Sequence, residues 1–133
     1  MSGKIIDALN DALSLELAAL TQYMWHHVMA KGLESPGFRD EVKKISIAEM
    51  RHAEALAERI NYLGGTPTIK IGQVRVGGDL QKMISDDVKA EEEAIELYKK
   101  IYELAKDDPV TQDLILKILG EEEEHHDFFL SLK

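Results

Sequence analysis

The chain has 133 residues, of which 44% are hydrophobic and 31% are charged, a composition typical of one domain built from amphipathic helices. Its formal net charge of −9 at pH 7 favours cations and argues against nucleic acid as partners, and the lack of cysteine excludes disulfides, thiolate metal sites and iron–sulfur centres. We expect no membrane span and a cytoplasmic location, because the sequence has no apolar run of about 18 residues and no signal-peptide pattern.

Four segments carry apolar residues at helical spacing, and stretches that contain glycine or proline separate them. The predicted helices cover residues 2–31, 38–63, 79–106 and 110–132. Residues 32–37 and 107–109 are short breaks, so the first two and the last two helices each form an antiparallel hairpin. The predicted fold class is therefore all-α, with residues 1–133 in a single domain.

Residues 64–78 form a connection that is too long for a simple turn, and the alternation of apolar residues from Ile69 to Val76 indicates an extended chain. The helix before it would be about 39 Å long, whereas the connection can reach about 50 Å when extended. It can therefore cross the whole bundle, and the second and third helices would then run parallel. This long crossover between two hairpins is typical of a ferritin-like four-helix bundle.

A pattern of carboxylate and imidazole side chains occurs twice with nearly equal spacing. In each copy, a glutamate precedes a Glu-x-x-His motif, by 33 residues in the first copy and by 31 in the second. Residues three apart share one face of a helix, so each motif can direct an oxygen and a nitrogen to the same point. These ligand types suit iron or manganese. The residues are Glu16, Glu49 and His52 in the first copy, and Glu91, Glu122 and His125 in the second.

All six of these residues interrupt the apolar stripes of the predicted helices. Glu91 and Glu122 also lie in acidic runs, where a solvated helix face is the ordinary explanation. However, four carboxylates buried without neutralisation would cost many kcal/mol in a dry core. A dinuclear cation site would offset that cost. The duplicated pattern in the middle of apolar stripes therefore predicts that all six residues bind two metal ions.

The chain resembles bacterioferritin over nearly its whole length, in the segments LSLELAALTQYMWHH, ISIAEMRHAEALAERINYLGGTPT, SDDVKAEEEAIELY and ILGEEEEHHDFF. The resemblance implies two iron ions per subunit and a role for each of the six residues. These roles are bridging carboxylates for Glu49 and Glu122, terminal carboxylates for Glu16 and Glu91, and nitrogen ligands for His52 and His125. Tyr23 falls where the family has a tyrosine beside the site, either as a one-electron donor or as a core tyrosine with a satisfied hydroxyl.

Met50 directly follows Glu49, so it points away from the interior of the bundle. Other apolar residues on the outer side would form an exposed patch with it, and such patches usually mark an interface. They are Leu17, Met24, Trp25, Val28 and Ile47. The resemblance to bacterioferritin implies one haem per two-fold dimer, ligated by Met50 from both subunits. The alternative is that Met50 only packs in a dimer contact.

Two features differ from the family pattern. The chain ends at Lys133, where family members usually continue into a fifth helix that lines contacts of a 24-subunit shell. Lys44 and Ala48 stand where some members place a histidine and an aspartate for iron on the inner wall. We therefore expect a homo-oligomer built from two-fold dimers, with a closed shell of about twelve subunits favoured over 24.

The resemblance implies iron storage and detoxification by a ferroxidase, in which Fe(II) is oxidised to Fe(III) by O2 or H2O2. Two alternatives remain open. One is a rubrerythrin-like peroxide reductase, although the chain lacks the cysteines of the rubredoxin domain that supplies such proteins with electrons. The other is a non-enzymatic haem-binding dimer in which the metal site only stabilises the fold.

Overall fold

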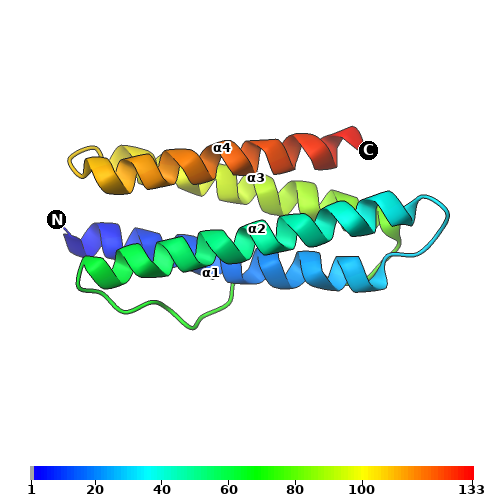
Figure 1. The fold of residues 1–133 in the computed structure, drawn as a ribbon, viewed down its shortest axis with the longest axis horizontal. Helices are drawn as coiled ribbons and strands as arrows, with labels where there is room; N and C mark the ends of the chain where they lie inside the picture. Colours follow the sequence, from blue (N-terminus) through cyan, green and yellow to red (C-terminus); the bar gives the residue numbers. More distant parts are fainter. Residues whose placement is uncertain (1) are drawn as a thin grey trace.

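The computed structural model describes residues 2–133 and consists of four long helices (Figure 1). The helices are α1 (Ser2–Met29), α2 (Ser35–Tyr62), α3 (Leu80–Leu104) and α4 (Pro109–Ser131). The described residues contain no strand, so the all-α prediction is confirmed. Each helix end lies within three residues of its predicted position. Within residues 2–133, no helix has the length and apolar character needed to cross a membrane.

The helices form two antiparallel hairpins, α1 with α2 and α3 with α4 (Figure 1). The crossover, residues 63–79, runs from one end of the bundle to the other, so α2 and α3 point in the same direction, as its length predicted (Figure 1). The crossover lies against α1, where the amide of Gly72 donates to the carbonyl of Ser14 at 3.0 Å. A Cβ at residue 72 would lie 3.3 Å from that carbonyl oxygen, so glycine permits the close approach.

Residues at the helix ends explain where the helices begin. Asp79 caps α3 by accepting from a backbone amide of its first turn at 2.9 Å, and Asp108 caps α4 by accepting from the amide of Thr111 at 3.2 Å. Arg59 of α2 donates to Asp108 at 3.0 Å and thereby ties the end of α2 to the start of α4. Helix α2 begins three residues before its predicted start, because Pro36 fits the first turn of a helix, where no amide hydrogen is required.

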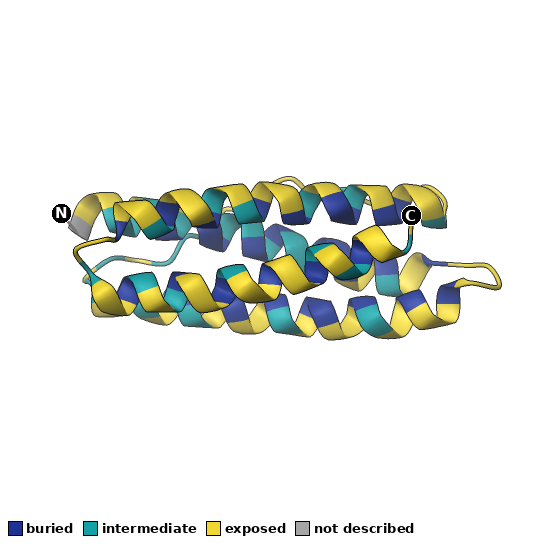
Figure 2. Cartoon of the chain, turned by 90° about the horizontal axis from the view of Figure 1, so that it is seen from above, coloured by how far each residue is buried: buried dark blue, intermediate teal, exposed yellow. Residues whose placement is uncertain are grey.

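The core consists of two apolar clusters, and the inward faces of all four helices are buried (Figure 2). One cluster includes Leu9, Leu56, Tyr98 and Ile115, and the other includes Tyr23, Phe38, Val42 and Phe129. Along every helix, the residues predicted to bind metal lie between the residues of these two clusters. The fold therefore places a buried polar layer midway along the bundle, with apolar side chains on both sides of it.

Candidate metal centre

The residues predicted to bind metal all lie in this polar layer, and each is at most 9% exposed. Helices α1 and α3 each contribute one glutamate, whereas α2 and α4 each contribute a Glu-x-x-His pair. The structure therefore brings both copies of the sequence pattern together in space. The residues are Glu16 of α1, Glu49 and His52 of α2, Glu91 of α3, and Glu122 and His125 of α4.

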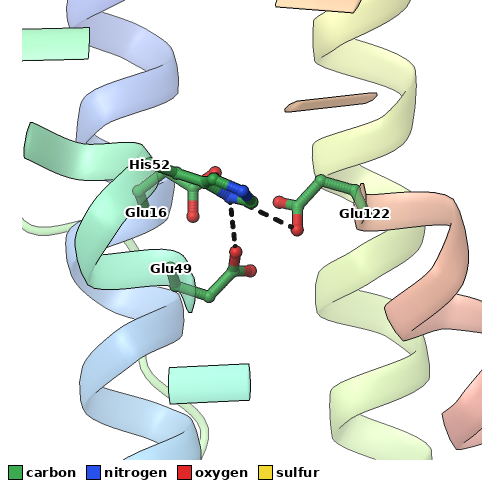
Figure 3. A group of neighbouring side chains, drawn as sticks. All are labelled: Glu16, Glu49, His52 and Glu122. Atoms are coloured by element: carbon green, nitrogen blue, oxygen red, sulfur yellow. Dashed lines mark ion pairs between the residues drawn. The ribbon is translucent and has the colours of Figure 1, made fainter. Parts of the chain in front are cut away.

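These side chains form two overlapping groups of four, each with ligand atoms within 4.8 Å of one another. Glu49 and Glu122 belong to both groups. The first group also contains Glu16 and His52, and Figure 3 shows its four side chains converging from α1, α2 and α4. The second group instead contains the glutamate of α3 and the histidine of α4. Two groups that share two carboxylates suit two cations a few ångströms apart.

Both histidines direct Nδ1 toward the carboxylates. His52 Nδ1 lies 2.8 Å from Glu49 Oε1, and His125 Nδ1 lies 3.0 Å from Glu122 Oε1. The other ring nitrogen of His52, Nε2, lies 3.1 Å from the exposed carboxylate of Glu121. Such outer contacts orient ligand histidines at metal sites. Glu121 could not be recognised from the sequence, because it lies in a run of four glutamates.

Six buried polar atoms of this layer have no hydrogen-bond partner among the described residues. They are Glu16 Oε1, Glu49 Oε1 and Oε2, His52 Nδ1, Glu91 Oε1 and Glu122 Oε2. His52 Nδ1 and Glu49 Oε1 are close enough for an ion pair, but their directions do not give a hydrogen bond. Buried polar atoms of this kind are costly unless something binds them. Because they are oxygens and a nitrogen in two converging groups, the residues fit a pair of iron or manganese ions.

Three side chains of the cluster, Glu49, Glu122 and His52, have raised pKa values and so bind protons more tightly than usual. Burial raises the pKa of Glu49 and of Glu122 well above the ordinary value, and the negative charge of Glu16 raises both pKa values further. Burial by itself lowers the pKa of His52, but contact with Glu16 and the other carboxylate charges raise this pKa from 6.5 to about 9. Divalent cations that bind here would therefore displace protons.

Comparison with known proteins places the chain in a family. Residues 6–132 match the ferritin-like domain family. The chain is 37% identical over 129 residues to the bacterioferritin of Desulfovibrio desulfuricans, which spans 95% of this chain and 72% of that protein. It is 34% identical over 128 residues to the bacterioferritin of Brucella melitensis, which spans 94% of this chain and 80% of that protein. The chain belongs to the bacterioferritin family.

A solved bacterioferritin has the same fold. The X-ray structure of the Desulfovibrio desulfuricans bacterioferritin matches this chain with a TM-score of 0.93 and 35% identity, over 98% of this chain and 78% of that one. That structure is described as showing the diiron site in different catalytic states. The predicted resemblance and the predicted ferritin-like four-helix bundle are both confirmed.

Two buried tyrosines contact the carboxylates of this bacterioferritin-family chain. Tyr23 Oη donates to Glu91 Oε2 at 2.5 Å. Tyr98 Oη donates to Glu16 Oε2, also at 2.5 Å. Tyr23 was predicted to lie beside the site, but Tyr98 was not, because an aromatic residue in the apolar stripe of a helix is usually a packing residue. The overlooked signal is spacing, since Tyr98 follows Glu91 by seven residues just as Tyr23 follows Glu16.

A second buried polar group, also not predicted, connects the crossover to α1 and α3. Asp87 accepts from Gln22 Nε2 at 2.9 Å and pairs with His26 Nδ1 at 2.8 Å. His26 Nε2 lies 3.1 Å from the carbonyl oxygen of Arg75, and Gln22 Oε1 accepts from the Arg75 amide at 2.9 Å. Gln22 and Arg75 also line the small cavity that reaches Glu91. The crossover is therefore fixed to α1 and α3 beside the cavity that reaches Glu91.

Met50 lies on the surface of α2 with 53% of its area exposed, and it is not part of the buried cluster. Other large apolar side chains are exposed on α1 and α2. Together with Met50, they form what we call the apolar face, which consists of Met24, Trp25, Val28, Ile47 and Met50. Leu17 was expected in the same patch, but it is half-buried and packs against the core.

Proposed function

We propose that this protein stores iron and oxidises Fe(II) to Fe(III) at the two overlapping ligand groups. The observation that carries the proposal is the burial of four carboxylates and two imidazoles whose ligand atoms lie within 4.8 Å of one another in each group. Two Fe(II) would supply the positive charge that this cluster requires, together with two electrons. With two protons, these electrons reduce one O2 to H2O2 or one H2O2 to two H2O.

We infer the role of each residue from the sharing of ligands between the groups. The two glutamates that belong to both groups would bridge the metals, and each remaining glutamate would bind one metal with one histidine. Glu49 and Glu122 would thus be shared by both metals, Glu16 and His52 would hold one metal, and Glu91 and His125 would hold the other. The apolar clusters on both sides would keep bulk water out of the reaction.

Three side chains would exchange protons or electrons during the reaction, namely Glu49, Glu122 and Tyr23. Glu49 and Glu122 hold protons more tightly than usual because burial raises their pKa, so cation binding releases protons from the site. When only one Fe(II) is bound, Tyr23 would act as a one-electron donor and supply the second of the two electrons that O2 or H2O2 takes up. Its hydroxyl donates to Glu91 at 2.5 Å, so the proton that Tyr23 loses on oxidation can pass to that carboxylate.

Haem binding between two copies of the chain forms a second part of the proposal. Met50 carries an exposed thioether sulfur, which would suit haem iron as a ligand, and the exposed apolar face to which it belongs would suit the apolar macrocycle. A two-fold axis would supply one Met50 from each copy, giving one haem per dimer. This dimer would be the unit of a larger homo-oligomer. A closed shell of about twelve subunits stays a prediction, which light scattering would test.

Replacing one bridging glutamate tests the function. The Glu122→Ala substitution removes a ligand that both groups share, so the rapid phase of Fe(II) oxidation should disappear. The measurement is the ferric absorbance after the Fe(II)-loaded protein is mixed with O2. Glu123→Ala is the matched control, because Glu123 is the next residue of the same acidic run but is exposed. The control should keep the wild-type rate. A wild-type rate in Glu122→Ala would contradict the proposal.

A further inference from the structure

The two buried tyrosines form a crossed pair between α1 and α3. Tyr23 of α1 donates to the carboxylate of Glu91 on α3, and Tyr98 of α3 donates to the carboxylate of Glu16 on α1. Each tyrosine follows the glutamate of its own helix by seven residues, which is about two helical turns. Each therefore reaches across to the glutamate of the opposite helix, and the two contacts repeat the duplication of the ligand pattern.

Each tyrosine hydroxyl contacts only one of the two carboxylate oxygens of the glutamate to which it donates. The hydroxyls contact Glu91 Oε2 and Glu16 Oε2, whereas Glu91 Oε1 and Glu16 Oε1 are buried and have no hydrogen-bond partner within residues 2–133. A carboxylate held at one oxygen cannot rotate freely, so the other oxygen keeps a fixed direction. That second oxygen is buried without a partner and is therefore available to a cation. The oxygens that accept from the tyrosines also face the site, because Glu16 Oε2 lies 3.4 Å from His52 Nδ1 and Glu91 Oε2 lies 3.8 Å from His125 Nδ1.

The rings are held by different parts of the core. Tyr98 belongs to the apolar cluster that contains Leu56, whereas Tyr23 belongs to the other cluster and packs on Phe129, with ring centroids 5.4 Å apart. Both side chains are 0% exposed. Burial and the nearby carboxylates raise the pKa of both hydroxyls well above 10, so both remain protonated donors. The two contacts therefore lie on opposite sides of the polar layer, and both are fully buried.

We propose that Tyr98 is a positioning residue for the half of the site that contains Glu16, as Tyr23 is for the half that contains Glu91, and that the crossed pair gives the two halves matched affinity for divalent cations. This inference rests on the proposed two-metal function. Hydrogen-bond partners of metal ligands typically change metal affinity by about 10–100-fold when removed. Loss of one hydroxyl should therefore weaken one half by that factor and leave the other half unchanged.

The test is a titration of the metal-free protein with Co(II), followed by its visible absorption, which reports binding without oxidation. The variants are Tyr98→Phe and Tyr23→Phe, which keep the ring and remove only the hydroxyl. Tyr102→Phe, on the same helix and partly buried against the same cluster as Tyr98, is the matched control. Helical circular dichroism and the thermal midpoint establish that each variant folds. The wild type and the control should bind two Co(II) per chain with similar affinity, and each test variant should bind one of the two about 10–100-fold more weakly.

Two further backgrounds identify which half is affected. In His125→Ala, the group with Glu16 and His52 remains complete, so Tyr98→Phe should weaken the remaining Co(II) and Tyr23→Phe should not. In His52→Ala, the group with Glu91 and His125 remains complete, so Tyr23→Phe should weaken the remaining Co(II) and Tyr98→Phe should not. Wild-type affinity in Tyr98→Phe, or equal weakening of both halves by one substitution, would overturn the tyrosine proposal while leaving the two-metal function intact. A wild-type chain that fails to bind two Co(II) would overturn both.

Discussion

Glu49 and Met50 are neighbours in the sequence, yet they serve different surfaces of the molecule. Glu49 is 0% exposed, and neither of its carboxylate oxygens has a hydrogen-bond partner within the described chain. Met50, turned by about 100° around the helix axis, faces outward. One short segment of α2 therefore contributes both to the buried cluster of carboxylates and histidines and to the apolar face, and the two contributions can be tested separately.

Met50→Leu should abolish haem binding and leave Fe(II) oxidation at the wild-type rate, because leucine has nearly the same volume but no sulfur. The measurement is the Soret absorbance per chain of protein purified from a haem-sufficient host. Met83→Leu is the control, since Met83 is a methionine of α3 that is buried in the core and does not belong to the apolar face. Wild-type protein without a Soret band, or haem retained by Met50→Leu, would refute the haem proposal.

The positions of the six clustered residues could be predicted from sequence because each interrupts a helical apolar stripe, where a charge needs a compensating partner. The contacts that orient them could not. Tyr98 and Glu16 are 82 residues apart, and His52 and Glu121 are 69 apart. No local period links residues at such distances, so the sequence alone gives Tyr98 only the character of a core aromatic residue and Glu121 only that of a surface charge.

At the scale of an element, the path of the crossover could be predicted from the sequence, but its packing could not. Its length alone predicted that it spans the bundle, and the parallel direction of α2 and α3 followed from that. Its alternating apolar residues did not predict how it packs, because Ile69 and Ile71 are exposed. The crossover is instead fixed by polar side chains of α1, such as Asn10, which accepts from the amide of Thr68 at 2.8 Å.

Asp87→Ala should loosen this attachment. The substitution leaves Gln22 and His26 without their shared partner in a buried site, and breaking a buried pair of this kind costs about 3 kcal/mol of unfolding free energy. Hydrogen exchange of the Arg75 amide should also accelerate. Asp86→Ala is the control, because Asp86 pairs with the exposed Lys82 and should cost less than about 1 kcal/mol. Urea unfolding checks the first effect, and unchanged stability and exchange in Asp87→Ala would disprove this role.

At the scale of the whole molecule, the fold must accommodate a large negative charge. The chain has a formal net charge of −9 and buries the carboxylates of Glu16, Glu49, Glu91 and Glu122 in one layer. Without a cation, these charges repel one another in a site that water does not screen. The energetic balance of the fold therefore depends on what neutralises the layer, either protons or metal ions.

The metal-free protein should lose stability as pH rises. Glu49 and Glu122 have raised pKa values in the folded state, so the folded chain binds more protons than the unfolded chain above about pH 4.5, and the unfolding free energy falls as they ionise. The stabilisation from His52 is present below pH 6.5 and is lost as pH rises through about 9. The thermal midpoint of metal-free protein should therefore fall between about pH 5.5 and pH 8.5.

Saturating Co(II) should remove or reverse this slope, because the cation replaces protons as the neutralising charge and binds better when the ligands are ionised. The thermal midpoint measured with and without Co(II) across that pH range checks the prediction. A metal-free protein that becomes more stable as pH rises would contradict the account of a carboxylate layer built for cations.

The most direct test of the central claim is to count the iron oxidised by each chain. Fe(II) is added in increasing ratios to the metal-free protein under anaerobic conditions, each sample is mixed rapidly with O2, and the amplitude of the fast ferric absorbance phase is recorded. Two overlapping ligand groups predict that this amplitude rises linearly and stops at two Fe(II) per chain, while slower uptake beyond two reports storage. A fast phase that ends at one Fe(II) per chain, or the absence of any fast phase, would contradict a paired metal centre.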